Sequence, residues 1–141
     1  MTKEVLVKVE GLQTDSKEEA VVVSALGAYH RRNGKYYIRY DEVTEDGQGL
    51  IHNMLKIASG QIVITKKGSF QSQMTFDIME GTQTNYQTPY GVIALNIDTK
   101  LIEIEEFDDE IKVKLKYDLS SEGKPISNNM INITVKAQRD N

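Results

Sequence analysis

Hydrophobic and polar residues alternate along most of this chain with a period of two. The stretches IKVKLKYDL at 111–119 and INITVKAQ at 131–138 each place an apolar side chain at every second position. Lysine, asparagine, threonine and other polar residues occupy most positions between them. Because successive side chains of a strand point to opposite faces, the alternation predicts strands with one buried and one solvated face, which is typical of antiparallel sheets.

The same alternation predicts strands through the rest of the chain. Asn33-Gly34 predicts a tight hairpin, and Gly, Ser and Asp residues mark further turns at short intervals. Residues 11–17 are predicted as a loop or one helical turn, and residues 49–59, which also fit helical spacing, mostly as strand. The other predicted strands cover residues 5–9, 20–31, 35–43, 61–66, 70–79, 84–97 and 101–107.

The number of strands predicts how the sheet is arranged. About eight to ten strands that each bury one face would leave exposed edges and an exposed apolar face in one flat sheet. We therefore predict a single domain, residues 1–141, that is all-β and antiparallel and forms a closed or nearly closed meander barrel. A sandwich of two sheets is the alternative. A barrel of this size is either filled by side chains or holds one small ligand.

The stretch YQTPYG at 86–91 places a proline inside extended sequence. Proline has no N–H for a strand ladder, and it favours extended geometry at the residue before it, Thr88. Gly91 supplies the backbone freedom that a bulge or a sharp bend requires. The stretch is therefore predicted to be a kinked strand that turns a corner of the barrel and redirects Thr88 and Tyr90.

Several motifs of this chain resemble a known family. They are YYIRYDE at 36–42, MLKI at 54–57, VITKKGSFQSQMTF at 63–76, YQTPYG at 86–91 with VIALNI after it, and VKLKYDL at 113–119. In this order, from about Val5 to Val135, they resemble the uncharacterised bacterial YwiB-like family.

The resemblance implies a small lipocalin-like barrel of the calycin type. It implies no activity, ligand or catalytic residue. One position departs from the family pattern, because Lys67 stands where an arginine is expected before the glycine of TKKG. A lysine keeps the charge and loses the bidentate geometry of arginine.

Composition and charge narrow the class of partner. The chain has a formal charge of −4 and an isoelectric point near 5.2, which argues against nucleic acid or an anionic membrane as the main partner. No apolar run approaches the roughly 20 residues of a membrane helix, and MTKEVLVKVEGL has no signal-peptide pattern, so a cytoplasmic protein is predicted. Without cysteine the sequence offers no thiol chemistry, and it predicts no metal site and no cofactor.

Residue types that often carry catalysis are present without the spacing that catalysis needs. His30 and His52 are far apart in the sequence and show no zinc-ligand spacing, and no G-x-S-x-G motif accompanies them. The acidic stretch EIEEFDDE at 103–110 is predicted to be a solvated hairpin tip. The basic stretch HRRNGK at 30–35 is interpreted as a short basic hairpin tip without a binding role, because the protein as a whole is acidic. We therefore predict a protein that is not an enzyme.

Polar residues that share a face with the apolar positions are the best candidates for a site. A tyrosine on that face combines apolar bulk with a hydroxyl that requires a partner, a mixture that lines small-molecule pockets. The sequence predicts a non-enzymatic protein that holds a small, partly apolar ligand inside the barrel. Three tyrosines would line the interior and three polar residues would lie near its mouth: Tyr40, Tyr90 and Tyr117, and Glu42, Lys66 and Thr88.

Two other interpretations remain open at this stage. In one, the tyrosines only fill a solid barrel, and its outer face binds a protein partner or a second copy of the chain, which would make a homo-oligomer. In the other, Glu42 or His52 serves a hydrolase or an isomerase in a cavity. Fold analogy alone does not choose between them.

Overall fold

A computed structural model describes residues 2–14, 19–44, 46–68, 71–88 and 90–138. Every regular element in these ranges is a strand, so the prediction of an all-β antiparallel fold of about eight to ten strands is confirmed. The strands are β1 (Thr2–Gln13), β2 (Val21–Arg32), β3 (Lys35–Val43), β4 (Leu50–Ala58), β5 (Gln61–Gly68), β6 (Ser72–Asp77), β7 (Thr82–Thr88), β8 (Gly91–Glu106), β9 (Glu110–Ser121) and β10 (Lys124–Ala137).

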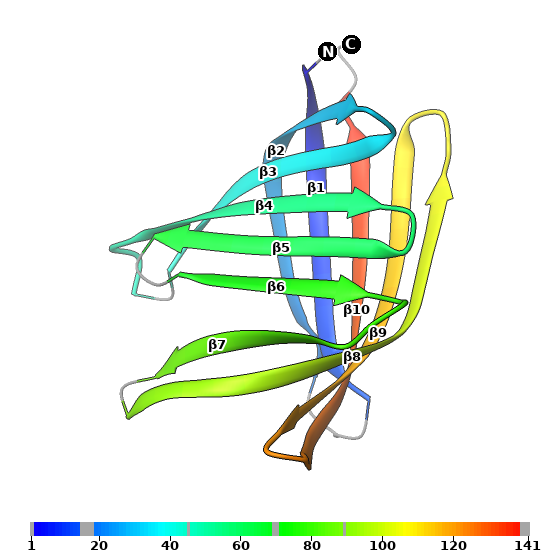
Figure 1. Ribbon diagram of the computed structural model, residues 1–141. Coiled ribbons are helices and arrows are strands. Elements are labelled where there is room, and N and C mark those ends of the chain that lie inside the picture. The colour runs from blue at the N-terminus through cyan, green and yellow to red at the C-terminus, as the bar shows by residue number, and fades with distance from the viewer. Residues whose placement is uncertain (1, 15–18, 45, 69–70, 89, 139–141) are drawn as a thin grey trace.

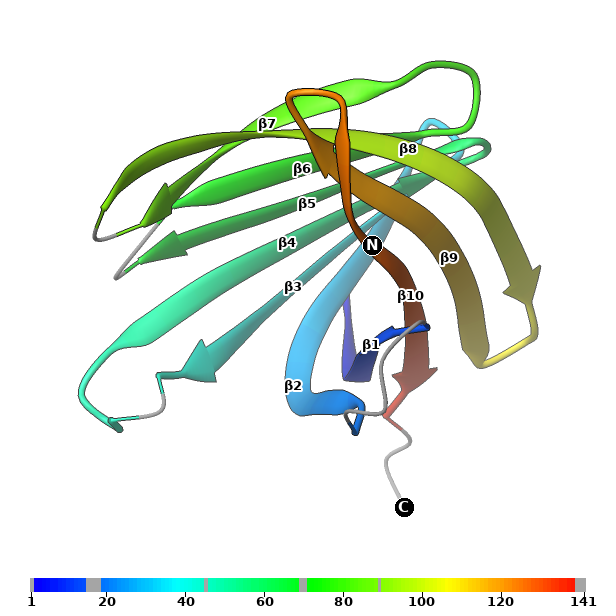
Figure 2. The same ribbon diagram turned by 90° about the horizontal axis from the view of Figure 1, so that it is seen from below.

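The strands form one antiparallel sheet that curls into a nearly closed barrel (Figures 1 and 2). Its order is β6-β5-β4-β3-β2-β1-β10-β9-β8-β7, so consecutive strands are neighbours except at β6 and β7, and β1 pairs with β10. The edges β6 and β7 lie beside each other at a seam without a backbone ladder. Two hydroxyls of β7 bridge it: Thr82 donates to the carbonyl of Thr75, and Thr84 donates to the carbonyl of Gln73 at 2.7 Å.

The core is built from the inward positions of the strands. Its fully buried side chains include Phe76, Ile38, Leu55, Ile57, Ile62, Ile97, Leu115, Ile133 and Val7. In β9 the burial alternates strictly from Ile111 to Tyr117, with an exposed lysine at each position between. This agreement between burial and sequence period explains why the barrel could be predicted from the pattern.

The prediction of a single kinked strand over 84–97 was wrong. The chain reverses between Thr88 and Gly91, which are paired residues of β7 and β8, so YQTPYG contains a hairpin turn. Gly91 has a φ of 126°, a conformation that glycine adopts readily. Pro89 lies outside the described residues.

The predicted break between strands 84–97 and 101–107 is also absent, because β8 continues through it. A register shift between Thr99 and Leu101 marks a β-bulge in the pairing with β9. The extra residue changes the parity of the inward positions. Ile97 and Thr99 face inward before the bulge and Ile102 faces inward after it, so the inward face of β8 continues across the bulge. The sequence signal for a turn therefore belongs to a bulge.

Two further segments are longer or more regular than the sequence indicated. β1 continues to Gln13, so part of the segment predicted as loop or helical turn is strand, while residues 15–18 lie outside the described ranges. Residues 50–58 form β4, which confirms the prediction of strand for this ambiguous segment. Its inward residues alternate with outward ones from Ile51 onward, as a half-buried strand requires.

Candidate functional site

A polar cluster lies on the inward face of β3, β4 and β5 near the end of the barrel where β3 and β5 finish. Strand register places Asn53 directly beside Tyr40 on one side and Lys66 on the other. Glu42 Oε1 accepts a hydrogen bond from Lys66 Nζ at 2.9 Å and another from Asn53 Nδ2 at 3.1 Å. One carboxylate oxygen therefore joins side chains from three strands.

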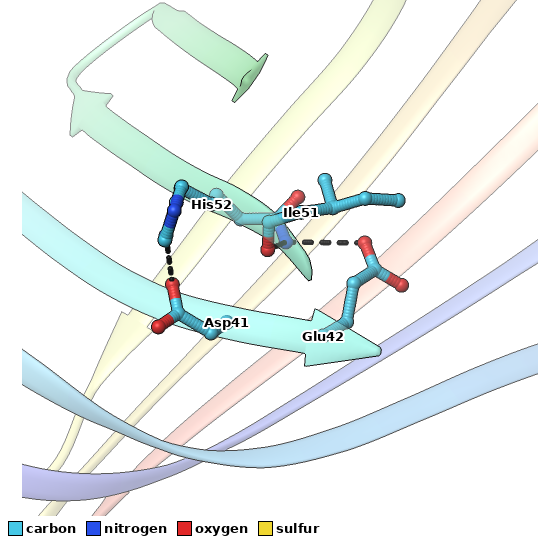
Figure 3. Close-up of polar contacts among 5 residues, drawn as sticks. Asp41, Glu42, Ile51 and His52 are labelled. Carbon is cyan, nitrogen blue, oxygen red and sulfur yellow. Dashed lines mark hydrogen bonds and ion pairs between the residues drawn. The ribbon is translucent and has the colours of Figure 1, made fainter. Parts of the chain in front are cut away.

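The outward neighbours of this cluster form a separate pair. His52 Nδ1 lies 2.7 Å from Asp41 Oδ1, and both side chains are largely exposed. Figure 3 shows this contact on the same two strands that carry Glu42 and Ile51. Because alternate residues of a strand face opposite sides, His52 lies outside the barrel and does not belong to the interior site.

Asn53 is the most informative residue of the cluster. Its side chain is only 3% exposed, and Nδ2 donates both to Glu42 and to the backbone carbonyl of Ile51, the second at 3.4 Å. Both partners are acceptors, so the amide nitrogen must face them and the orientation of the side chain is fixed. Oδ1 then points elsewhere, is buried, and has no hydrogen-bond partner among the described residues. An unmatched buried acceptor of this kind costs about 1–3 kcal/mol.

A second unmatched polar atom lies on the opposite wall. Thr99 is 6% exposed, and its Oγ1 is buried without a hydrogen-bond partner in the described part of the chain. Thr99 pairs across β8 and β9 with Tyr117, whose ring contacts Phe76 with centroids 4.7 Å apart.

Two tyrosines of the interior keep their hydroxyls in a strongly desolvated environment. Burial raises the pKa of Tyr117 to about 12, and burial together with the charge of Glu42 raises the pKa of Tyr40 to about 12. Neither hydroxyl makes a hydrogen bond to another described residue. Both phenols therefore remain neutral at physiological pH and can donate a hydrogen bond.

A recess beside the seam leads to the polar cluster. It has a volume of about 340 Å³ and is lined by residues of β5, β6 and β7 and by Gln71, including Lys66, Ser72 and Thr84. The side chain of Lys66 is one-third exposed and lines this recess, and its ammonium contacts the half-buried carboxylate of Glu42. The cluster is therefore adjacent to the part of the barrel that lacks a backbone ladder.

The other end of the barrel holds a recess of about 400 Å³ under the β8–β9 turn. Arg31 forms an ion pair with Glu106 at 3.5 Å and lies over the ring of Tyr36, with 5.3 Å between the guanidinium carbon and the ring centroid. Tyr29 stacks on Tyr36 with centroids 6.0 Å apart. Burial is the largest cause of the raised pKa of both tyrosines. Arg31 and Glu106 are therefore already paired with each other, in contrast to the unmatched polar atoms of Asn53 and Thr99.

A family described as a domain of unknown function, DUF1934, matches residues 7–133. The chain belongs to the DUF1934 family. The uncharacterized beta-barrel protein YwiB of Bacillus subtilis (strain 168) is 21% identical over 108 residues, which cover 77% of this chain and 75% of YwiB. The crystal structure of the ywiB protein from Bacillus subtilis matches with a TM-score of 0.81 and 18% identity, over 98% of this chain and 94% of that one. The resemblance to the YwiB-like family is therefore confirmed, and the barrel fold is shared.

The DUF1934 barrel places the six predicted site residues differently. Tyr40, Glu42 and Lys66 lie together on the inward face, and Tyr117 is buried in the same core. Tyr90 does not line the interior, because it follows the β7–β8 turn and its side chain is 100% exposed. The side chain of Thr88 lies outside those that the structure describes.

Sequence reasoning missed Asn53 and Thr99 in the DUF1934 barrel. Asn53 shares its parity with Ile51 and Leu55, and that signal was available once residues 49–59 were treated as strand. Thr99 lay in a predicted turn, whereas β8 continues through this segment and Thr99 faces inward like Ile97 two residues before it. Across the described residues, no group of three or more His, Asp or Glu side chains could hold a metal ion. Those residues also form no helix with the length and apolarity needed to cross a membrane.

Proposed function

We propose that the interior of this barrel binds a small, partly apolar molecule without converting it chemically. The observation that carries the proposal is the buried, unmatched Oδ1 of Asn53, supported by the unmatched Oγ1 of Thr99 on the opposite wall. A ligand that donates a hydrogen bond to Oδ1 would remove its desolvation penalty, and this gain is available only in the complex.

The charges of the cluster define the polar end of the ligand. Glu42 and Lys66 already neutralise each other at 2.9 Å, so the cluster itself has no net charge to attract a carboxylate or a phosphate. The Oδ1 of Asn53 can only accept, which requires an O–H or N–H on the ligand. The apolar remainder would contact Tyr40 and the partly buried hydrophobic side chains that pack against the core, among them Ile64 and Met74. The ligand is therefore a neutral hydrogen-bond donor with an apolar body.

A matched set of ten-carbon probes tests this chemistry. We expect 1-decanol and decanamide to raise the melting temperature at pH 7.5, while decanoate, an anion without a donor, raises it much less. A probe at about ten times its Kd stabilises a protein by about 1.4 kcal/mol, which corresponds to about 4 °C for a domain of this size.

Asn53→Leu is the decisive variant, because it removes the acceptor and keeps a side chain of similar size. Its melting temperature should respond equally and weakly to all three probes. His52→Leu, next to it but on the outer face, serves as the control and should keep the wild-type preference. Equal shifts for the three probes in the wild-type protein, or no shift at all, would contradict the proposal.

A solid barrel that binds a protein partner or a second copy is the second candidate function. One observation favours it: Leu6 and Leu26 are direct cross-strand partners on the outer face of β1 and β2, and both are exposed. The exposed side chain of Val22 lies on the same face. This candidate requires an interior without a guest, which separates it from the first.

A further inference from the structure

The outer face of β2 to β6 carries a concentration of positive charge that the composition does not reveal. We define the outer basic face by five cations that point away from the core on β2, β3, β4 and β5: Arg32, Lys35, Arg39, Lys56 and Lys67. Among the described residues none of the five forms an ion pair. This face is cationic on a chain whose formal charge is −4.

The few carboxylates on the same face are already engaged. Asp41 contacts His52 at 2.7 Å. Asp77, at the end of β6, accepts hydrogen bonds from Gln61 Nε2 at 3.1 Å and from the backbone N–H of Met79 at 2.9 Å. The five cations are therefore left to bind an external anion, since unpaired ammonium and guanidinium groups attract one over about a Debye length.

A groove of about 530 Å³ crosses the outer basic face, and none of the described residues that line it is a carboxylate. Arg32, Arg39 and Lys56 border it together with two stacked rings, those of His30 and Tyr37. The ring centroids are 4.9 Å apart with an interplanar angle of 8°, and Lys56 Nζ lies 5.9 Å from the centroid of Tyr37. The uncharged polar side chains of the groove are those of Asn33, Thr65 and Gln73.

The area over which the five cations are spread indicates a partner larger than one phosphate. From β2 to β5 they span three strand spacings, about 14 Å, and Lys35 and Arg39 lie about 13 Å apart along β3. Cations over such an area, combined with the half-buried aromatic rings that border the groove, match the surfaces that hold single-stranded nucleic acid, where lysine and arginine contact phosphates and rings stack with bases.

We propose that the outer basic face binds single-stranded nucleic acid without strong sequence preference. The expectation from net charge was the opposite, because it counted charges over the whole chain, whereas five cations lie together on the outer face of β2 to β5. This proposal is independent of the interior ligand, since alternate residues of β3 and β4 serve the two sites from opposite faces.

Fluorescence anisotropy with a fluorescein-labelled twelve-residue oligouridine tests the proposal. We expect a micromolar Kd in 50 mM NaCl. Three phosphate contacts give a slope of about −2 for log K against log salt, so 200 mM NaCl should weaken binding about 15-fold. The double variant Arg39→Gln/Lys56→Gln should bind at least tenfold more weakly and with a shallower slope. Tyr37→Leu should weaken binding at least fivefold with the slope unchanged.

The matched control removes the same charge elsewhere. Lys112→Gln/Lys114→Gln, on the outer face of β9, should keep the wild-type affinity to within twofold once circular dichroism shows that all variants fold. The proposal is overturned if wild-type protein does not bind in 50 mM NaCl, or if the control pair loses as much affinity as the test pair. It is also overturned if poly-glutamate or dextran sulfate competes as well as the oligouridine at equal charge, which would make the face a general polyanion or acidic-protein site.

Discussion

Raising the pH from 10 to 12 should lower the free energy of unfolding by about 4 kcal/mol through two buried tyrosines, Tyr40 and Tyr117. Each has a pKa of about 12 in the folded protein and an ordinary value of 10.0. Between these two values the unfolded chain loses the phenolic proton and the folded chain retains it. The stabilisation is therefore complete below pH 10 and is lost as the pH rises to about 12, by about 2–3 kcal/mol for each tyrosine.

Urea unfolding at pH 8, 10, 11 and 12 measures this loss. Lysines also titrate in this range, so the informative quantity is the difference between wild-type protein and the double variant Tyr40→Phe/Tyr117→Phe. The double variant should lose about 4 kcal/mol less than the wild type between pH 10 and 12. Tyr90→Phe, a change at a fully exposed side chain, should follow the wild-type curve. If the double variant and wild type lose stability in parallel, the two phenols are not desolvated and the interior site as described is wrong.

Replacing Gly27 by alanine should destabilise the barrel by about 3 kcal/mol. Gly27 occupies an inward position of β2 where the pairing with β3 begins, opposite Tyr40. A Cβ atom there would overlap the backbone carbonyl oxygen of Arg39 and would lie 3.2 Å from both Tyr40 Cβ and Val7 Cγ2. Backbone cannot move aside as a flexible side chain can, so the cost lies at the upper end of the 1–3 kcal/mol typical of overpacked cores.

Gly11→Ala supplies the matched control for this prediction. Gly11 is also in a strand, β1, but a Cβ atom there would meet nothing within 4 Å. Its replacement should change stability by less than about 1 kcal/mol. Chemical denaturation of the three proteins at one pH gives both numbers. Equal stability of the two variants would show that β2 and β3 do not approach each other as closely as the barrel requires.

Much of the fold follows from the sequence because burial and side-chain period agree. In β9 and β10 every second residue from Ile111 and Ile131 is apolar, and the strand faces then follow from the two-residue period. Closure is less accessible, because it depends on how much the sheet curls. At the seam it rests on the hydroxyls of Thr82 and Thr84, which donate hydrogen bonds to backbone carbonyls of β6. No pattern in the sequence indicates these contacts.

The site was predictable where residues lie within regular strands and not where they lie beside turns and bulges. Glu42 and Lys66 follow buried positions at even spacing, so their place at the end of the inward face could be inferred. Tyr90 was assigned to the interior because the proline was interpreted as a kink, whereas the chain reverses there. Thr99 was placed in a turn between two strands, whereas β8 runs through this segment and forms its bulge after Thr99.

Native mass spectrometry of the protein, purified without detergent and incubated with a small-molecule extract, tests the central claim most directly. The claim is that the unmatched polar atoms inside the barrel, above all Asn53 Oδ1, hold a neutral guest. The account predicts that part of the 15.9 kDa chain carries an additional few hundred daltons, and that Asn53→Leu loses this adduct while His52→Leu retains it. A wild-type spectrum that contains only the bare chain, as monomer or as dimer, would contradict the account.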